Sequence, residues 1–173
     1  MNSSPGIVVV MGLPGSGKTY FAQHLARVLS AEPISSDQVR AEHRQRGRYE
    51  LSDKLAVYQA MTEQAEVALA DGQSVVLDAT FHLRRFRRFV EEWAEGQGYP
   101  LRYIEIIADE STTLKRTRGH RPDSEADYEV YRQLKREAEP LEQVPLRLDS
   151  SEEDIDTMLQ RALDYLTDDT STP

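Results

Sequence analysis

The 173-residue chain contains no cysteine, few aromatic residues and no excess of basic residues. The absence of cysteine excludes disulfide bonds and thiolate-bound metal sites. Aromatic residues make up 8% of the sequence, and 30 Asp and Glu outnumber 21 Lys and Arg, which gives a formal net charge of −9. A chain this acidic is not expected to coat nucleic acid non-specifically, because such binding needs a broad basic surface. Contact with a polyanion would therefore require a local basic patch.

Long hydrophobic runs are also missing. No stretch approaches the roughly 20 apolar residues that cross a bilayer, and the first residues, MNSSPGIVVVMG, lack the basic region of a signal peptide. We therefore expect a cytoplasmic protein without membrane contact. Hydrophobic residues at 39% and charged residues at 29% are typical of a globular protein. The length suits a single domain over residues 1–173, and the sequence does not indicate the oligomeric state.

Short apolar runs alternate with segments of helical periodicity along most of the chain. Strands are predicted at 7–11, 33–35, 74–78, 101–108 and 145–149. Helices are predicted at 18–29, 37–43, 53–70, 82–95, 110–118, 127–139 and 152–166. This order predicts βαβ units, and hence a three-layer α/β fold with a five-stranded parallel sheet flanked by helices. Residues 115–127 are expected to form a small helical lid, and the tail 167–173 to be disordered.

The segment GLPGSGKT at 12–19 satisfies the phosphate-loop pattern G-x-x-x-x-G-K-[ST]. Its glycines let the backbone curl so that N–H groups point at phosphate oxygens, and the positive end of the following helix adds to that field. Lys18 is predicted to reach the β- and γ-phosphates, and Thr19 to bind Mg²⁺. We therefore predict binding of a nucleoside triphosphate, taken to be ATP, with Mg²⁺. The residues expected to contact the nucleotide are Gly12, Leu13, Pro14, Gly15, Ser16, Gly17, Lys18 and Thr19.

Two missing motifs narrow the class of protein. The chain has neither the Asn-Lys-x-Asp guanine reader of GTPases nor the Leu-Ser-Gly-Gly signature of transporter ATPases. A compact P-loop kinase remains, in which the phosphates of the nucleotide face an acceptor across a small cleft. The alternative is a nucleotide-binding switch, or an NTPase interaction module without a dedicated acceptor.

Five motifs resemble those of the polynucleotide-kinase and zeta-toxin-like P-loop kinases: GLPGSGKTYFAQHLA, ISSDQVR, VVLDATF, RTRGHRPDSEADYEVYRQL and LRLDSS. The resemblance extends over residues 7–166. It implies that Asp37 is the general base that takes the proton of the acceptor hydroxyl. It also implies that Arg40 holds the acceptor, and that Asp78 and Thr80 line the acceptor site.

The same resemblance implies that arginines of the lid clasp the transferring phosphoryl group. The candidates are Arg116 and Arg121 in catalysis and Arg118 in nucleotide binding. The composition of this segment favours the same role. The run KRTRGHR places four cations beside a phosphate site, where they would neutralise the charge of the transition state. An ordinary basic connection between two helices is the alternative.

Asp37 follows a predicted strand, and two roles suit that position. Asp is favoured at the start of a helix, but Ser35 and Ser36 stand beside it and either could serve as the cap. Strand ends at the carboxyl edge of an α/β sheet also hold ligands, and Arg40 is close enough to share one helical turn with Asp37. We therefore favour Asp37 as a general base.

Asp78 ends another predicted strand, where it would either reach Mg²⁺ or orient Arg40. The basic run LRRFRRF at 83–89 follows. Most of it is interpreted as a solvated helix face, with Arg84 as the residue that contacts the acceptor. The acceptor itself stays open between a small-molecule hydroxyl and a 5′-hydroxyl end of a polynucleotide. The acidic net charge favours the small molecule, whereas the basic residues at 40–48 and 84–88 favour nucleic acid.

Overall fold

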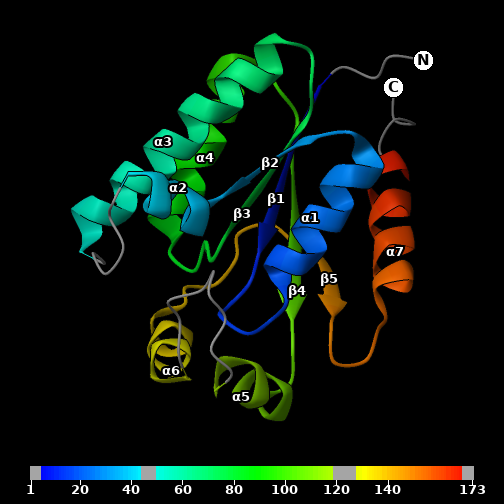
Figure 1. The fold of residues 1–173 in the computed structure, drawn as a ribbon. Helices are drawn as coiled ribbons and strands as arrows, with labels where there is room; N and C mark the ends of the chain where they lie inside the picture. The colour runs from blue at the N-terminus through cyan, green and yellow to red at the C-terminus, as the bar shows by residue number, and fades with distance from the viewer. Residues whose placement is uncertain (1–4, 44–49, 119–127, 169–173) are drawn as a thin grey trace.

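A computed structural model describes residues 5–43, 50–118 and 128–168 of the chain (Figure 1). The strands are β1 (Ile7–Met11), β2 (Glu32–Ser35), β3 (Val75–Ala79), β4 (Leu101–Ile107) and β5 (Leu146–Asp149). The helices are α1 (Lys18–Leu29), α2 (Ser36–Glu42), α3 (Leu51–Ala70), α4 (Arg84–Gln97), α5 (Glu110–Arg118), α6 (Tyr128–Glu137) and α7 (Ile155–Thr167). Every predicted strand and helix is present, with bounds that differ by three residues or fewer from those expected.

The five strands form one parallel sheet in the order β2-β3-β1-β4-β5. Every residue of β1 and β3 is buried, because strands in the middle of a parallel sheet are covered on both faces. Asp78 of β3 lies opposite Val10 of β1 on one side and Ser35 of β2 on the other. The predicted three-layer α/β fold with a five-stranded parallel sheet is therefore confirmed.

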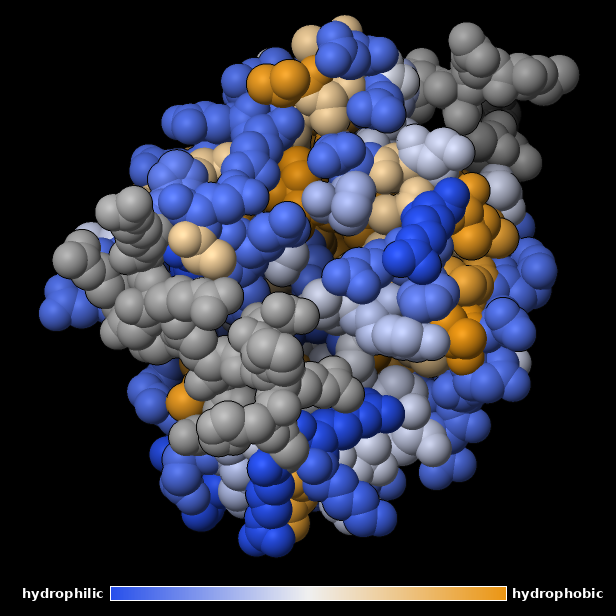
Figure 2. Space-filling view, in the orientation of Figure 1, coloured by the Kyte–Doolittle hydropathy of each residue, from blue (hydrophilic) through white to orange (hydrophobic). Residues whose placement is uncertain are grey.

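Two layers of helices sandwich the sheet. Figure 1 shows α2, α3 and α4 over one face and α1 and α7 over the other. Side chains alternate along a strand, so Val9 joins the first core cluster with Tyr58 and Phe86, whereas Val10 joins the second with Phe21. On the outside, hydrophilic residues cover most of the face drawn in Figure 2. Within the described ranges, no helix is long and apolar enough to cross a membrane.

Helices α5 and α6 lie beyond the end of the sheet at which the strands terminate (Figure 1). This carboxyl edge is where open α/β sheets bind ligands. The predicted lid, 115–127, is described as far as Arg118, so its remaining residues 119–127 lie outside the described part of the chain. The last five residues of the predicted tail, 169–173, lie outside it as well.

Candidate active site

The phosphate loop connects β1 to α1 and has the backbone shape that its glycines predict. Gly15 and Gly17 have φ angles of 79° and 88°, in the left-handed region that favours glycine. Gly12 is required for a different reason, because a Cβ there would lie 2.5 Å from the carbonyl oxygen of Ile106. Lys18 begins α1 directly after the loop, so its ammonium group and the helix dipole both act at this turn.

Asp78 joins the phosphate loop to the end of β3. Its Oδ2 accepts a 2.7 Å hydrogen bond from the Thr19 hydroxyl. The side chain is buried, and its other oxygen, Oδ1, has no hydrogen-bond partner among the described residues. Burial raises the pKa of the Asp78 carboxyl, and the positive charge of Lys18 opposes that rise. One carboxylate oxygen and the lone pairs of the Thr19 hydroxyl therefore remain for a ligand.

This pair of residues fits a magnesium ion. Mg²⁺ prefers oxygen ligands, and proteins usually hold it through one or two side chains together with waters and substrate phosphates. The described parts of the chain contain no group of three or more His, Cys, Asp or Glu that could hold a metal ion. A cation beside Thr19 and Asp78 would therefore depend on the nucleotide for part of its coordination, which is how P-loop enzymes use Mg²⁺.

Asp37 lies in the first turn of α2, and it is not the cap of that helix. The N-cap residue is Ser35, and Oδ1 of Asp37 lies 3.4 Å from Nη1 of Arg40. The Asp37 side chain is 41% exposed and that of Arg40 only 14%, so the carboxylate is accessible from solvent while it pairs with the arginine. Because Ser35 and Asp78 are neighbours across β2 and β3, this ion pair stands beside the Asp78 carboxylate.

A buried tyrosine holds the loop that follows β3. The Tyr58 hydroxyl of α3 accepts the N–H of Phe81 at 3.3 Å. Phe81 has a φ of 49°, a conformation that costs about 1–3 kcal/mol for a residue other than glycine. Thr80 Oγ1 lies 3.2 Å from Nδ1 of His82. These contacts fix the Thr80 hydroxyl, which is one of the predicted acceptor ligands, at the carboxyl edge of the sheet.

His82 is buried in the same loop. Burial, with a further contribution from the positive charge of Lys54, lowers the pKa of His82 to about 4. Its Nε2 lies 3.8 Å from a carboxylate oxygen of Glu137 and has no hydrogen-bond partner in the described ranges. The imidazole is therefore neutral at neutral pH, and it acts in this loop as a hydrogen-bonding group without charge.

The expectation that the arginines after Arg84 form a solvated face is wrong for Arg87. This residue is 2% exposed, and its guanidinium donates to the carbonyl of Phe81 at 2.9 Å and to that of Pro140 at 2.7 Å. The guanidinium thus ties the loop after β3 to the segment that follows α6. Arg85 and Arg88 are exposed, as predicted.

Arg84 is the first residue of α4, and it contacts two acidic residues. Its backbone N–H donates to Glu139 at 2.5 Å, and its guanidinium pairs with Glu142. Its side chain is 53% exposed. Contact of Arg84 with an acceptor stays a prediction, and an acceptor would compete with Glu142 for the guanidinium.

Of the two predicted lid arginines that the structure describes, Arg116 lies against the phosphate loop. It donates to the carbonyl of Gly15 at 3.1 Å and to the Ser150 hydroxyl at 2.8 Å. Arg118 is exposed at the last residue of α5, and Arg121 lies outside the described residues. Contacts of Arg118 and Arg121 with a nucleotide therefore stay predictions.

Sequence reasoning missed Tyr58, His82 and Arg87. A signal for Arg87 was present, because helical spacing aligns it with the buried Val90 and Ala94 of α4. Tyr58 carries no comparable signal, since its hydrogen-bond partner Phe81 comes from another element of the fold. For His82, the contact that the sequence does not show is the one to Glu137 of α6.

The fold and the phosphate loop define a P-loop kinase-like α/β protein. The chain superposes on a sugar kinase from Janibacter sp. HTCC2649 with a TM-score of 0.72, at 19% identity over 94% of each chain. It superposes on the APS kinase CysC of Mycobacterium tuberculosis, solved with AMPPNP and APS, with a TM-score of 0.75, at 18% identity over 94% of this chain and 98% of that one. It superposes on a gluconokinase from Sinorhizobium meliloti 1021 with a TM-score of 0.69, at 21% identity over 92% of this chain and 90% of that one. Identities this low establish the fold alone.

The chain belongs to the AAA_33 family, described as an AAA domain, which it matches over residues 7–141. It is 31% identical over 124 residues to human 6-phosphofructo-2-kinase/fructose-2,6-bisphosphatase 1, a match that covers 62% of this chain and 26% of the human protein. It is also 33% identical over 87 residues to the uncharacterized protein Rv2004c of Mycobacterium tuberculosis, covering 43% of this chain and 18% of that protein. The chain thus spans only about a quarter or less of these relatives.

Proposed function

We propose that this protein is a P-loop kinase that transfers the γ-phosphoryl group of ATP to a hydroxyl group of a small molecule. The observation that carries the proposal is the hydrogen bond between Thr19 and Asp78. It joins the phosphate loop to a buried carboxylate that has an unpaired oxygen within the described ranges. The exposed carboxylate of Asp37 lies at the same edge of the sheet, so nucleotide and acceptor would meet there.

On the nucleotide side, the loop N–H groups and Lys18 would bind the phosphates. Mg²⁺, held by Thr19 and Asp78, would neutralise charge on the β- and γ-phosphates. Arg118 and Arg121 are further candidates for contact with the phosphoryl group, as the resemblance to polynucleotide-kinase and zeta-toxin-like kinases implies.

On the acceptor side, the Asp37 carboxylate would accept the proton of the attacking hydroxyl. The hydroxyl oxygen forms a bond to the γ-phosphorus while the bond from that phosphorus to the bridging oxygen of ADP breaks. Arg40 keeps the carboxylate turned toward the edge of the sheet, 3.4 Å from its own guanidinium, and would also bind the acceptor. Thr80, fixed by His82, would contribute a further hydrogen bond.

A small acceptor is favoured over a 5′-hydroxyl nucleic-acid end because two of the four arginines in the basic run at 83–89 are already engaged within the protein. Arg87 is buried and bound to backbone carbonyls, and Arg84 is paired with Glu142. A nucleic-acid groove needs several cations that are available to the backbone phosphates. The names of three similar proteins also support a small acceptor, since they describe a 6-phosphofructo-2-kinase, a sugar kinase and a gluconokinase.

Replacement of Asp37 by asparagine tests the mechanism. The Asp37→Asn variant should bind Mg·ATP nearly as the wild type does, because the change is isosteric and Asp37 pairs with Arg40 and not with a residue of the phosphate loop. Phosphoryl transfer to a panel of small hydroxyl compounds should fall by roughly 10²–10⁴, the usual contribution of a general base. Asp156→Asn is the matched control, since Asp156 is an exposed residue in the first turn of α7. Unchanged transfer by Asp37→Asn would refute the assignment of the base.

A further inference from the structure

The outer side of the phosphate loop is held by one arginine. Arg116 is a partly buried residue of α5, and its Nη1 donates to the carbonyl oxygens of Gly15 at 3.1 Å and Ser16 at 3.2 Å. The same guanidinium reaches the turn after β5, where Nη1 donates to the Ser150 hydroxyl at 2.8 Å and Nη2 to the Ser150 carbonyl at 3.2 Å. One planar group therefore bridges two segments that are far apart in sequence.

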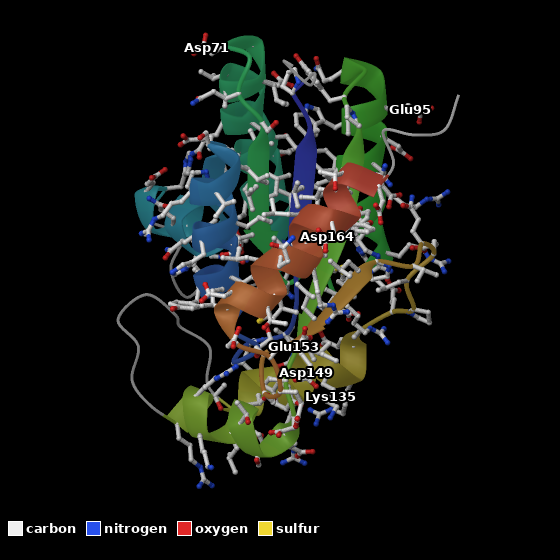
Figure 3. All side chains as sticks on the ribbon, turned by 90° about the vertical axis from the view of Figure 1, so that its right-hand side faces the viewer. Asp71, Glu95, Lys135, Asp149, Glu153 and Asp164 are labelled. Atoms are coloured by element: carbon white, nitrogen blue, oxygen red, sulfur yellow. The ribbon has the colours of Figure 1, made fainter. Side chains whose placement is uncertain are left out.

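The turn that contains Ser150 is itself fixed. Ser150 Oγ donates to the carbonyl of Ser16 at 2.5 Å, and its N–H donates to the carbonyl of Ile107 at 2.9 Å. The N–H of Asp149 donates to Glu153 at 2.9 Å, which closes the turn. Figure 3 shows Asp149 and Glu153 at this turn, on the side of the sheet end where α5 and α6 lie. Arg116 is thus anchored to a rigid support as well as to the loop.

Helix α5 also packs directly against two glycines of the phosphate loop. A Cβ at Gly15 would lie 2.9 Å from Cγ2 of Thr117 and 3.1 Å from Cγ2 of Thr113. A Cβ at Gly17 would lie 3.3 Å from Nη1 of Arg116. The outer surface of the loop is therefore in contact with α5, and the loop has little room to move toward that helix.

These contacts determine where the N–H of Gly17 in the loop points. The carbonyl of Ser16 and the N–H of Gly17 belong to one peptide unit, and in a trans peptide the two point in opposite directions. Because the Ser16 carbonyl faces Arg116 and Ser150, the Gly17 N–H faces the inner side of the loop, where phosphate would bind. A cation bound to the carbonyl also polarises the peptide and strengthens its N–H as a donor.

We propose that Arg116 is a positioning residue of the phosphate loop, which acts through the loop carbonyls and the Ser150 turn. This role differs from contact with the γ-phosphate, which the sequence resemblance implies, and from contact with the base. The inference rests on the proposed binding of nucleotide. Its distinguishing consequence is that every ligand with a phosphate chain depends on Arg116 to a similar degree.

Calorimetric titration with three ligands separates these roles. The ligands are Mg·ATP, Mg·ADP and inorganic tripolyphosphate with Mg²⁺, each titrated into the wild type and the Arg116→Met variant. A positioning role predicts that the variant binds all three about tenfold more weakly, the effect of losing a charged hydrogen bond. A selective loss of the two triphosphates would instead indicate contact with the γ-phosphate. A selective loss of ATP and ADP would indicate contact with the base, and either result would overturn the proposal.

Two further variants distinguish geometry from charge. Arg116→Lys keeps the charge, but a single ammonium group cannot replace the two donor nitrogens that contact the phosphate loop and the Ser150 turn. This variant should therefore bind all three ligands nearly as weakly as Arg116→Met. Ser150→Ala removes the hydroxyl that donates to the Ser16 carbonyl and accepts from Arg116, but it keeps the Ser150 carbonyl that binds Nη2. It should therefore weaken all three by a smaller factor, about threefold. Full recovery of affinity in Arg116→Lys would overturn the proposal. If Arg116→Met fails to fold, these two variants carry the comparison.

Arg132→Met is the matched control, because it removes the same charge from α6, where Arg132 pairs with Glu129 at the surface. It should bind the three ligands as the wild type does. All titrations are made well below the melting temperature of each variant, so that lost affinity is not lost folding. A wild-type protein that binds none of the three ligands would refute the proposed function, and with it the positioning role. A wild type that binds them and an Arg116→Met variant that is unaffected would refute the positioning role alone.

Discussion

Replacement of His82 by glutamine should flatten the acid side of the protein's stability profile. The pKa of His82 is about 4 in the folded protein and about 6.5 in an unfolded chain. As the pH falls, the unfolded state therefore takes up a proton first, which favours unfolding. The stability that neutral His82 provides at pH 7 declines below pH 6.5 and is lost completely below pH 4. Glutamine cannot be protonated, so the variant lacks this dependence.

The size of the effect follows from the two pKa values. Linkage gives a loss of roughly 2 kcal/mol in the free energy of unfolding at pH 5, and roughly 3 kcal/mol below pH 4. The His82 side chain is 3% exposed, so screening by solvent does not reduce these figures appreciably. Burial is the main cause of the low pKa, followed by the charge of Lys54, while Glu137 acts in the opposite direction.

Urea denaturation at pH 7.5, 6.5 and 5.0 measures the difference. The wild type should lose roughly 2 kcal/mol more than His82→Gln between pH 7.5 and pH 5.0. His43→Gln is the control, because His43 is exposed at the end of α2, and it should follow the wild-type curve. The wild type and the variants have the same carboxylates, so the contribution of these groups to the pH dependence of the free energy of unfolding cancels in the difference between two curves. Parallel curves for the wild type and His82→Gln would show that the imidazole is not buried as described.

Two other substitutions test the buried charges. Asp78→Asn should leave the ligand-free protein at pH 7 at least as stable as the wild type, because the raised pKa of this carboxyl means that burial disfavours its ionised form. The same variant should lose the increase in melting temperature that Mg·ATP produces, and a lower melting temperature without ligand would contradict the reasoning. Arg87→Met should lower the free energy of unfolding by about 1–3 kcal/mol, since it leaves the buried carbonyl of Phe81 without its donor. Exposed Arg88→Met should have almost no effect in the same urea experiment, and equal effects of the two substitutions would refute the burial of Arg87.

The fold was predictable because its signals are local. The run Ile7–Met11 is apolar throughout, as a strand covered on both faces must be. The glycines of 12–17 and the helix that starts at Lys18 mark the phosphate loop without any knowledge of the rest of the chain. Asp37 and Asp78 were identifiable as site candidates because each lies at or just after the end of a predicted strand, and strand ends meet at one edge of a parallel sheet.

The parts that could not be predicted depend on contacts between distant segments. The hydrogen bonds of Arg87 were not predictable, because its acceptor carbonyl on Pro140 lies 53 positions further along the chain. Arg116 reaches Gly15 over 101 positions and Ser150 over 34. A basic helix face and a basic lid look alike in sequence whether their cations face solvent, phosphate or backbone. Only the tertiary arrangement distinguishes these cases.

Transfer of labelled phosphate tests the central claim most directly. The protein is incubated with Mg²⁺ and ATP labelled at the γ-phosphate, together with separate panels of sugars, sugar acids, sugar phosphates and 5′-hydroxyl oligonucleotides. Asp37→Asn serves as the paired sample. Label should appear in a small hydroxyl compound, and Asp37→Asn should lower the rate of this transfer by roughly 10²–10⁴. Label found only in inorganic phosphate, or only in an oligonucleotide, would contradict the proposal of a small-molecule kinase.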